Sequence, residues 1–125
     1  MITDWRNELP MIITITPDNA EQIGRCIINE ILTAHQTRDY QLLTRHFSQK
    51  YKDVLTIERF EQAVDEAILP LGQLVSCDYL GYLKRVNEHQ LLWRVRFEHS
   101  DEDLLWQLYL CDDEAPVQVV ALWFS

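Results

Sequence analysis

The first third of the chain places its apolar residues with the spacing of an α-helix. Apolar side chains recur every three or four positions across residues 20–31. This spacing predicts a helix that has one buried stripe, and the helix is expected to end near Gln36. Thr16, Pro17 and Asp18 precede this stripe in the order of a helix start. They supply a capping hydroxyl, a proline at the first position and an acid near the positive helix end. The first helix is therefore expected to begin directly after Thr16.

Two further helices are predicted before the pattern changes. Residues 40–47 place three apolar side chains on one side of a short second helix, and residues 48–55 are expected to be a connection. A third helix begins at Thr56 and ends at residues 69–72, where a proline and a glycine stop it. Three N-terminal helices are thus expected.

From Gln73 onward the spacing changes from helical to alternating, which is typical of β-strands. Turn signals divide this part into four predicted strands, over residues 73–86, 90–98, 103–111 and 117–124. Gly81 inside the first strand is a natural position for a bulge or bend. The pattern predicts an α+β fold in which three N-terminal helices pack on a curved four-stranded antiparallel sheet.

Residues 1–15 lie ahead of this pattern, and residues 16–125 are interpreted as a single domain. Two interpretations of the leading segment stay open: an extra edge strand, or an arm that lies on a partner chain. Pro10 disfavours a central strand. Charged residues near the start interrupt the pattern that a secretory signal requires, so we expect a cytoplasmic protein.

Length and composition agree with one domain and narrow the range of partners. The 125 residues are 47% hydrophobic, which is enough for a single sizeable core. The 20 acidic and 11 basic side chains give a formal net charge of −9, so the average field repels a phosphate backbone. No segment approaches the roughly 20 apolar residues of a membrane span. Neither nucleic acid nor a membrane is an expected partner.

The spacing of cysteine, histidine and acidic residues predicts neither a metal site nor a cofactor. The three cysteines are odd in number and widely spaced, and the four histidines lack metal-ligand spacing. Two acidic triplets, residues 101–103 and 112–114, lie at opposite ends of the third strand. We interpret them as solvated turns that discourage aggregation at the edges.

Alternation along the two central strands separates two faces, because successive strand residues point to opposite sides of a sheet. One set is wholly apolar and must face the helices: Leu91, Trp93, Val95, Phe97, Leu104, Trp106, Leu108 and Leu110. The other set mixes apolar, arginine and aromatic side chains: Leu92, Arg94, Arg96, Glu98, Leu105, Gln107, Tyr109 and Cys111. The last strand is apolar on both sides, and its facing stays open.

The mixed set is typical of a protein interface, where arginine and tyrosine are enriched and lysine is depleted. We therefore expect a homodimer that forms through the outer face of the sheet. The residues assigned to this interface are Leu92, Arg94, Arg96, Leu105, Gln107, Tyr109 and Leu122. A monomer with scattered apolar surface residues is the alternative.

The order of elements resembles a known superfamily over roughly residues 17–125. The resemblance rests on the run "TPDNAEQIGRCIINEILTAHQTRDYQLLTRHFS", the helix "TIERFEQAVDEAILPLG" and the strand series that ends in "VQVVALWFS". These stretches resemble the nuclear-transport-factor-2-like superfamily, which has the cone-shaped cystatin-like α+β fold, and in particular its small bacterial members of unassigned function. The resemblance implies a cavity between helices and sheet, which serves catalysis in some members and binding in others.

An isomerase, dehydratase or cyclase of this fold would need an acid or base in that cavity. The apolar set on the two central strands offers none. The candidates on other elements are Asp78, His46 and Tyr51, although alternation turns Asp78 outward unless a bulge at Gly81 changes its facing.

The side chains expected to line a ligand pocket are all aromatic: Tyr40, Phe60, Tyr79, Trp93 and Trp106. Trp93 and Trp106 either fill the cone or form the wall of a site for a flat apolar ligand. The preferred interpretation is a non-catalytic binding or protein-interaction domain, whose ligand is a protein or a small apolar molecule. An enzyme with its active site in the cone is the alternative.

Overall fold

Helices occupy the first half of the chain and strands the second half in the computed structural model, which describes residues 13–125. The helices of this part are α1 (Ala20–Thr37), α2 (Tyr40–Leu43), α3 (Gln49–Val54) and α4 (Ile57–Ala63). A π-helical turn, η2 (Val64–Ile68), and a 3₁₀ turn, η3 (Leu69–Leu71), continue α4. The strands are β1 (Leu74–Arg85), β2 (Glu88–Phe97), β3 (Leu104–Cys111) and β4 (Gln118–Phe124).

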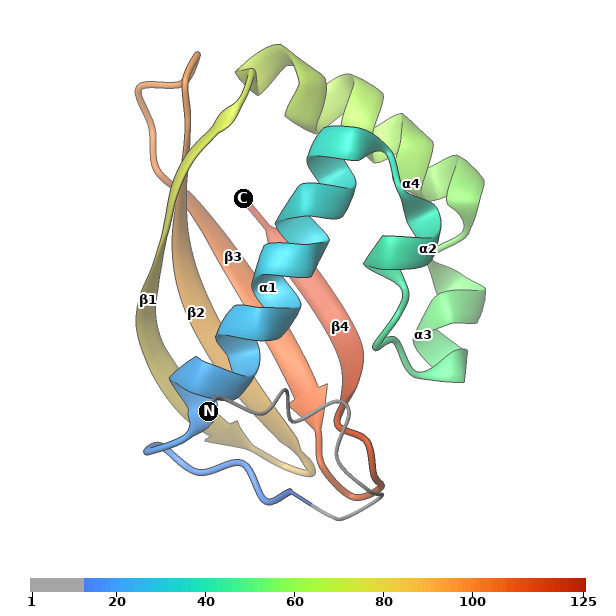
Figure 1. The fold of residues 1–125 in the computed structure, drawn as a ribbon, viewed down its shortest axis with the longest axis vertical. Coiled ribbons are helices and arrows are strands. Elements are labelled where there is room, and N and C mark those ends of the chain that lie inside the picture. The colour runs from blue at the N-terminus through green and yellow to red at the C-terminus, as the bar shows by residue number, and fades with distance from the viewer. Residues whose placement is uncertain (1–12) are drawn as a thin grey trace, which may run out of the picture.

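The four strands form one antiparallel sheet in the order β1-β2-β3-β4, so the predicted α+β meander is confirmed. Its strands differ from the predicted ranges by at most two residues at any end. The long helix α1 lies across one face of this sheet, α3 lies beside β4, and α2 packs on α1 (Figure 1). The sheet therefore has a covered inner face and an outer face without helices from the described part of the chain.

The first helix lies where the sequence predicts it, but it begins three residues later than predicted. Regular helix begins at Ala20, because residues 17–19 form a turn. Thr16 and Asn19 close this turn reciprocally: the Thr16 N–H donates to Asn19 Oδ1 at 2.7 Å, and the Asn19 N–H donates to Thr16 Oγ1 at 3.3 Å. This is the geometry of a capping box, with asparagine in the place of the usual glutamate.

The segment expected to be a connection contains a helix, so that prediction is wrong. Ser48 is the N-cap of α3, and its hydroxyl accepts a hydrogen bond from the Tyr51 N–H at 3.2 Å. The same segment adds to the sheet, because Phe47 forms a parallel bridge with Val119 of β4. A helix of six residues has little stability of its own, so contact with the sheet decides whether it forms.

The core lies between α1, α4 and the inner face of the sheet. Trp93 and Trp106 are opposite each other on β2 and β3, and both are completely buried. Helix α1 approaches Leu91 and Trp93 of β2 closely because residue 24 is a glycine. A Cβ atom there would lie 2.9 Å from the Trp93 ring, where a side chain does not fit. Tryptophan rings thus fill much of the space between helix and sheet.

Bulges decide the facing of the two outer strands. The β1–β2 register shifts between Tyr79 and Gly81, at the place that the sequence predicts, so Leu80 is an extra residue. A second shift pairs Tyr109 with Ala121 but Leu110 with Val119, which leaves an extra residue in β4. Facing therefore changes within each strand, and strict alternation fails there.

Leu122 is the assigned interface residue that this shift affects. It pairs with Leu108 on the inner face and packs against the core, so its assignment to the outer face is corrected. Trp123 takes the outward position in its place and is 65% exposed.

Only the last residues of the predicted N-terminal arm can be placed, because residues 1–12 lie outside the described part of the chain. Ile15 is buried, and its N–H donates to the Asp112 carboxylate at 2.8 Å. Residues 13–15 thus pack on their own chain.

Candidate functional site

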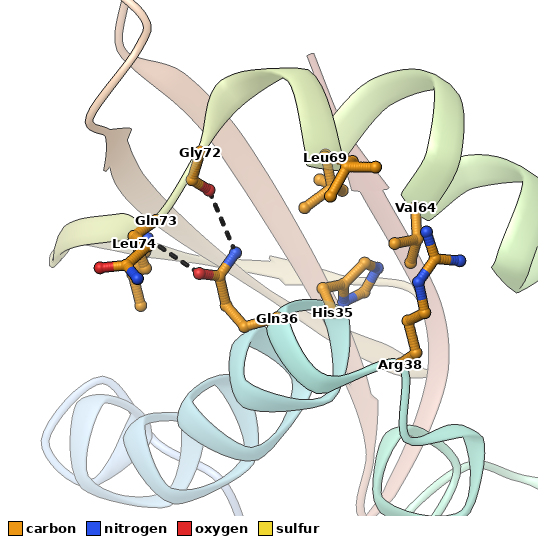
Figure 2. A pocket seen from close by; sticks show the side chains of 9 residues that line it. His35, Gln36, Arg38, Val64, Leu69, Gly72, Gln73 and Leu74 are labelled. Atoms are coloured by element: carbon orange, nitrogen blue, oxygen red, sulfur yellow. Dashed lines mark hydrogen bonds between the residues drawn. The ribbon is translucent and has the colours of Figure 1, made fainter.

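A pocket of about 440 Å³ opens where the end of α1 meets the π-helical turn and the start of β1 (Figure 2). Helix α1 contributes His35 and Gln36, and Arg38 follows directly after its last residue. Apolar side chains from η2 and η3 form the opposite wall, and residues 72–74 complete it. The volume lies within the usual range of small-molecule sites.

His35 is the buried polar group of this pocket, with 5% of its surface exposed. Its Nδ1 lies 2.8 Å from the Ile31 carbonyl oxygen, one turn earlier in α1. The edges or faces of three aromatic rings surround the imidazole, with centroid distances of 5.1 Å to Phe60, 5.1 Å to Trp106 and 6.1 Å to Phe124. Burial among these rings lowers the pKa of His35, although the Ile31 carbonyl acts in the opposite direction.

Gln36 fixes the side of the pocket where α1 meets β1. Its Nε2 donates to the Gly72 carbonyl oxygen at 3.4 Å, and its Oε1 accepts the Leu74 N–H at 3.1 Å (Figure 2). The amide therefore spans the connection into the sheet and is already engaged with the backbone. Gly72 has a φ of 79°, a conformation that favours glycine.

Arg38 lies where α1 ends. It adopts the left-handed conformation with a φ of 56°, and its N–H donates to the Ala34 carbonyl oxygen. Its guanidinium forms an ion pair with Asp65 of η2, and both side chains are substantially exposed. This pair joins the two sides of the pocket at its rim.

The three residues proposed from the sequence as acids or bases do not line this pocket. Asp78 lies opposite Arg94 in the β1–β2 register, and its carboxylate accepts a hydrogen bond from that guanidinium at 3.1 Å. Because Arg94 is on the outer face, Asp78 points away from the helices. His46 contacts the Glu30 carboxylate at 2.8 Å, beside the contact of Arg45 with the same carboxylate. Arg45 and His46 of this polar cluster lie just after the C-terminal end of α2.

Tyr51 holds the free edge of β4. Its hydroxyl donates to the Leu122 carbonyl oxygen at 3.2 Å and accepts the Leu122 N–H at 3.0 Å. Burial raises the pKa of Tyr51, and the hydrogen bond to Leu122 partly offsets this effect. Tyr51 also lines a separate hollow of about 290 Å³. Its hydroxyl, however, already donates one hydrogen bond to the β4 backbone and accepts another from it. The geometry indicates a structural role in covering a sheet edge.

The aromatic side chains expected to line a ligand pocket have other positions. Phe60, Trp93 and Trp106 are fully buried in the core. The Tyr40 hydroxyl donates to the Leu55 carbonyl oxygen at 2.7 Å, and the Tyr79 ring packs edge-on against Trp93 at 5.1 Å. None of the five lines the pocket at His35.

Sequence reasoning missed His35, although a signal was present. It follows Ile31 by four residues and Ile28 by seven, so it continues the apolar stripe of α1. A histidine on a buried stripe needs a hydrogen-bond partner, and here the helix backbone supplies it at one ring nitrogen only.

A second buried histidine lies on β2, in a different environment. His89 contacts the Tyr82 hydroxyl with Nδ1 at 2.7 Å and the Asp112 carboxylate with Nε2 at 3.0 Å. Both ring nitrogens thus have protein partners. This cluster joins three segments of the fold and leaves no ring nitrogen available for a ligand.

The outer face of the sheet carries the mixed surface predicted from alternation. Leu92, Leu105 and Tyr109 are partly buried there, whereas Arg94 and Arg96 are exposed. Arg94 pairs with Asp78 at 3.1 Å, and Arg96 pairs with Asp103 at 3.4 Å. On the edge strand β4, Trp123 is the most exposed large apolar side chain.

Residues 13–125 contain neither a membrane-spanning helix nor a cluster of metal ligands. Within this range no helix has the length and apolar character needed to cross a membrane. Across the same residues, no three histidine, cysteine or acidic side chains converge in a way that could hold a metal ion. Comparisons with protein-family models, curated proteins and solved structures found no match for the chain.

Proposed function

We propose that the protein is a non-catalytic interaction domain that forms a homodimer through the outer face of its sheet. The observation that carries this proposal is the exposure of Trp123, 65% of whose surface is accessible on a sheet face that also presents several leucines. Large exposed apolar patches mark interaction sites on soluble proteins, and tryptophan is among the residues most often decisive in interfaces.

The strand register makes this surface continuous. Leu92, Gln107 and Trp123 lie side by side in one row across β2, β3 and β4. Tyr109 and Ala121 are opposite each other in the next row. Leu80 and Leu83 extend the surface on β1, with 53% and 43% of their areas exposed. We define the outer patch as Leu80, Leu83, Leu92, Leu105, Tyr109 and Trp123.

The polar groups within this face are largely satisfied by one another. Gln90 accepts a hydrogen bond from Arg85 Nε at 2.8 Å and donates to Gln107 Oε1 at 2.6 Å. The Tyr109 hydroxyl donates to the same Gln107 oxygen at 3.3 Å. Burying this face against a partner therefore does not leave these groups without hydrogen bonds, and the cost of removing them from water is reduced.

The outer face is compatible with a second copy as the partner, although the molecule as a whole is acidic. The chain carries a formal net charge of −9, so two copies repel each other on average. On the outer face, however, Arg94 and Arg96 are each paired with a carboxylate. Local neutrality allows two copies to approach through this face, and a two-fold axis would place each outer patch against its equivalent.

The test is the mass of the protein in solution, measured by sedimentation velocity and light scattering from about 1 to 100 µM. We expect a dimer for the wild type. Trp123→Glu and Leu92→Glu should each raise the dimer Kd by about 30-fold or more, as expected for loss of about 2 kcal/mol at an interface hot spot. Val54→Glu is the matched control, because Val54 is 52% exposed on α3 and lies outside the outer patch.

Circular dichroism of each variant distinguishes dissociation from unfolding. A folded monomer of Trp123→Glu supports the proposal. A wild-type protein that stays monomeric at 100 µM would overturn it, as would a dimer that all three substitutions leave unchanged.

An isomerase, dehydratase or cyclase remains the alternative function. It has no support from Asp78, His46 or Tyr51, since their side chains are engaged with Arg94, Glu30 and the β4 backbone. The pocket at His35 is the place to look for catalysis, because it combines a buried imidazole with an open volume. Turnover in wild type that is lost in His35→Phe would favour the enzyme over the interaction domain.

A further inference from the structure

We propose that the pocket at the end of α1 binds a small, uncharged organic molecule that donates a hydrogen bond to Nε2 of His35. This inference is independent of the proposed dimer, because the pocket is formed by α1, η2, η3 and the start of β1 and not by the outer patch. The proposal gives His35 Nε2 the role of hydrogen-bond acceptor for the bound molecule.

The hydrogen bond at the other ring nitrogen determines which tautomer is present. A backbone carbonyl oxygen can only accept, so the contact of 2.8 Å to Ile31 requires a proton on Nδ1. In the neutral ring, Nε2 then carries the lone pair. Nε2 has no hydrogen-bond partner among residues 13–125, and His35 is among the residues that line the pocket.

The surroundings keep this ring neutral. The three aromatic rings that contact the imidazole offer no carboxylate to stabilise a positive charge. Burial lowers the pKa of His35, so the lone pair persists at neutral pH. Arg38, a charged side chain that lines the pocket, is paired with Asp65 of η2. A neutral acceptor in apolar surroundings selects a neutral donor and discriminates against an anion.

The other polar groups of the pocket are already used. The Gln36 amide bonds to the backbone of Gly72 and Leu74 through both of its ends. The opposite wall is apolar and consists of Val64, Ile68 and Leu69 (Figure 2). The site therefore combines one directional acceptor with an apolar wall, which suits a compact ring system with a single O–H or N–H group.

Indole and 1-methylindole are the probes that test this assignment. Indole has one N–H donor and does not ionise in water, whereas 1-methylindole keeps the ring but lacks the donor. We expect indole to bind at least about tenfold more tightly, because one hydrogen bond to a buried acceptor contributes roughly that factor. Titration followed by ¹⁵N NMR of histidine-labelled protein should shift the Nε2 resonance of His35 with indole and much less with 1-methylindole.

Two variants separate the acceptor from the cavity. His35→Phe keeps an aromatic ring but removes the lone pair, so the preference for indole over 1-methylindole should disappear. Leu69→Trp should weaken both probes, because residue 69 lines the pocket. Leu69 is 61% exposed, so a larger side chain there is compatible with folding.

The outcomes are distinct even if His35→Phe does not fold. Equal affinity of wild type for the two probes would overturn the proposal, as would the absence of saturable binding up to the solubility limit of indole. Binding that Leu69→Trp leaves unchanged would place the probe elsewhere and would also overturn it. None of these results depends on whether the protein is a dimer.

Discussion

The Nε2 atom of His89 lies 3.0 Å from the carboxylate of Asp112, and the same carboxylate oxygen accepts the Ile15 N–H at 2.8 Å. Asp112 thereby joins β2 to the segment that leads into α1. An ionised carboxylate can only accept, so His89 donates from Nε2 to Asp112, while its Nδ1 lies 2.7 Å from the Tyr82 hydroxyl. The cluster holds together residues that are about 100 positions apart, since Ile15 and Asp112 are separated by 97 residues.

Asp112→Ala should destabilise the protein by about 1–3 kcal/mol, because it leaves a buried His89 donor and a backbone N–H without partners. Urea denaturation at pH 7 measures the change. Asp113→Ala is the control, since Asp113 is exposed next to it, and its effect should be within about 0.5 kcal/mol of zero. Equal effects of the two substitutions would contradict the structural role of this carboxylate.

The Asp112 contact should also depend on pH. Burial acts to raise the pKa of Asp112, but hydrogen bonds from Ile15 and His89 outweigh it, so its pKa lies below the ordinary value. A lowered folded-state pKa gives a stability contribution that is present above about pH 4 and is lost as the pH falls further. Between pH 5 and pH 2, wild type should lose more unfolding free energy than Asp112→Asn, as measured by urea denaturation at each pH.

Tyr51→Phe should cost about 1–2 kcal/mol, because one hydroxyl serves both the N–H and the carbonyl of Leu122 at the edge of β4. Tyr79→Phe is a suitable control, since the structured residues give its hydroxyl no hydrogen bond and its ring would still pack on Trp93. Hydrogen exchange provides a second readout. The Leu122 amide should exchange faster in Tyr51→Phe while amides of β2 keep their protection, and unchanged exchange at Leu122 would refute the edge-covering role.

Gly72→Ala should destabilise by about 1–2 kcal/mol, whereas Gly81→Ala should be nearly neutral. Gly72 has a φ of 79°, and a Cβ there would lie 2.6 Å from the Glu98 side chain. A Cβ at Gly81 would meet no atom within 4 Å. Thermal denaturation of the two variants compares them directly. A larger loss for Gly81→Ala would show that the bulge in β1, and not the turn at Gly72, is the sensitive position.

Burial of His35 should make the protein less stable in acid. The unfolded histidine binds a proton with a pKa of about 6.5, while the folded one resists protonation because its pKa is lowered. Since the unfolded state then binds more protons, the free energy of unfolding falls as the pH drops below about 6.5. His35→Phe should reduce this slope between pH 7 and pH 5. His99→Gln should not, because His99 is exposed.

Alternation alone sorted the two central strands correctly. Leu91, Trp93 and Val95 of β2 and Trp106 and Leu108 of β3 are all completely buried. These strands pair without a register shift along their shared length. A regular ladder preserves the two-residue period, so the pattern of the sequence carries directly into the structure.

Alternation failed where a bulge interrupts the ladder. Val119 and Leu122 both face inward although they are three positions apart, because β4 contains an extra residue, Val120, where the register with Tyr109 and Leu110 of β3 shifts. Val75 and Leu83 of β1 are an even number of positions from Tyr79, which packs on the core, but both are exposed, because the β1–β2 register shifts at Leu74/Ser76 and at Tyr79/Gly81. A bulge depends on the fit between two strands, and neither strand alone specifies it.

The sequence by itself determined the order of helices and strands, the α+β class and the inner face of the central strands, because these follow from local periodicity and from turn residues. Only the tertiary structure decided that α3 forms against β4, that Trp123 faces outward, and that Asp78, His46 and Tyr51 are bound to other groups. It also placed His35 in a pocket with one ring nitrogen unpaired among the described residues. Such properties depend on contacts between segments far apart in the chain, and periodicity carries no information about which of those contacts form.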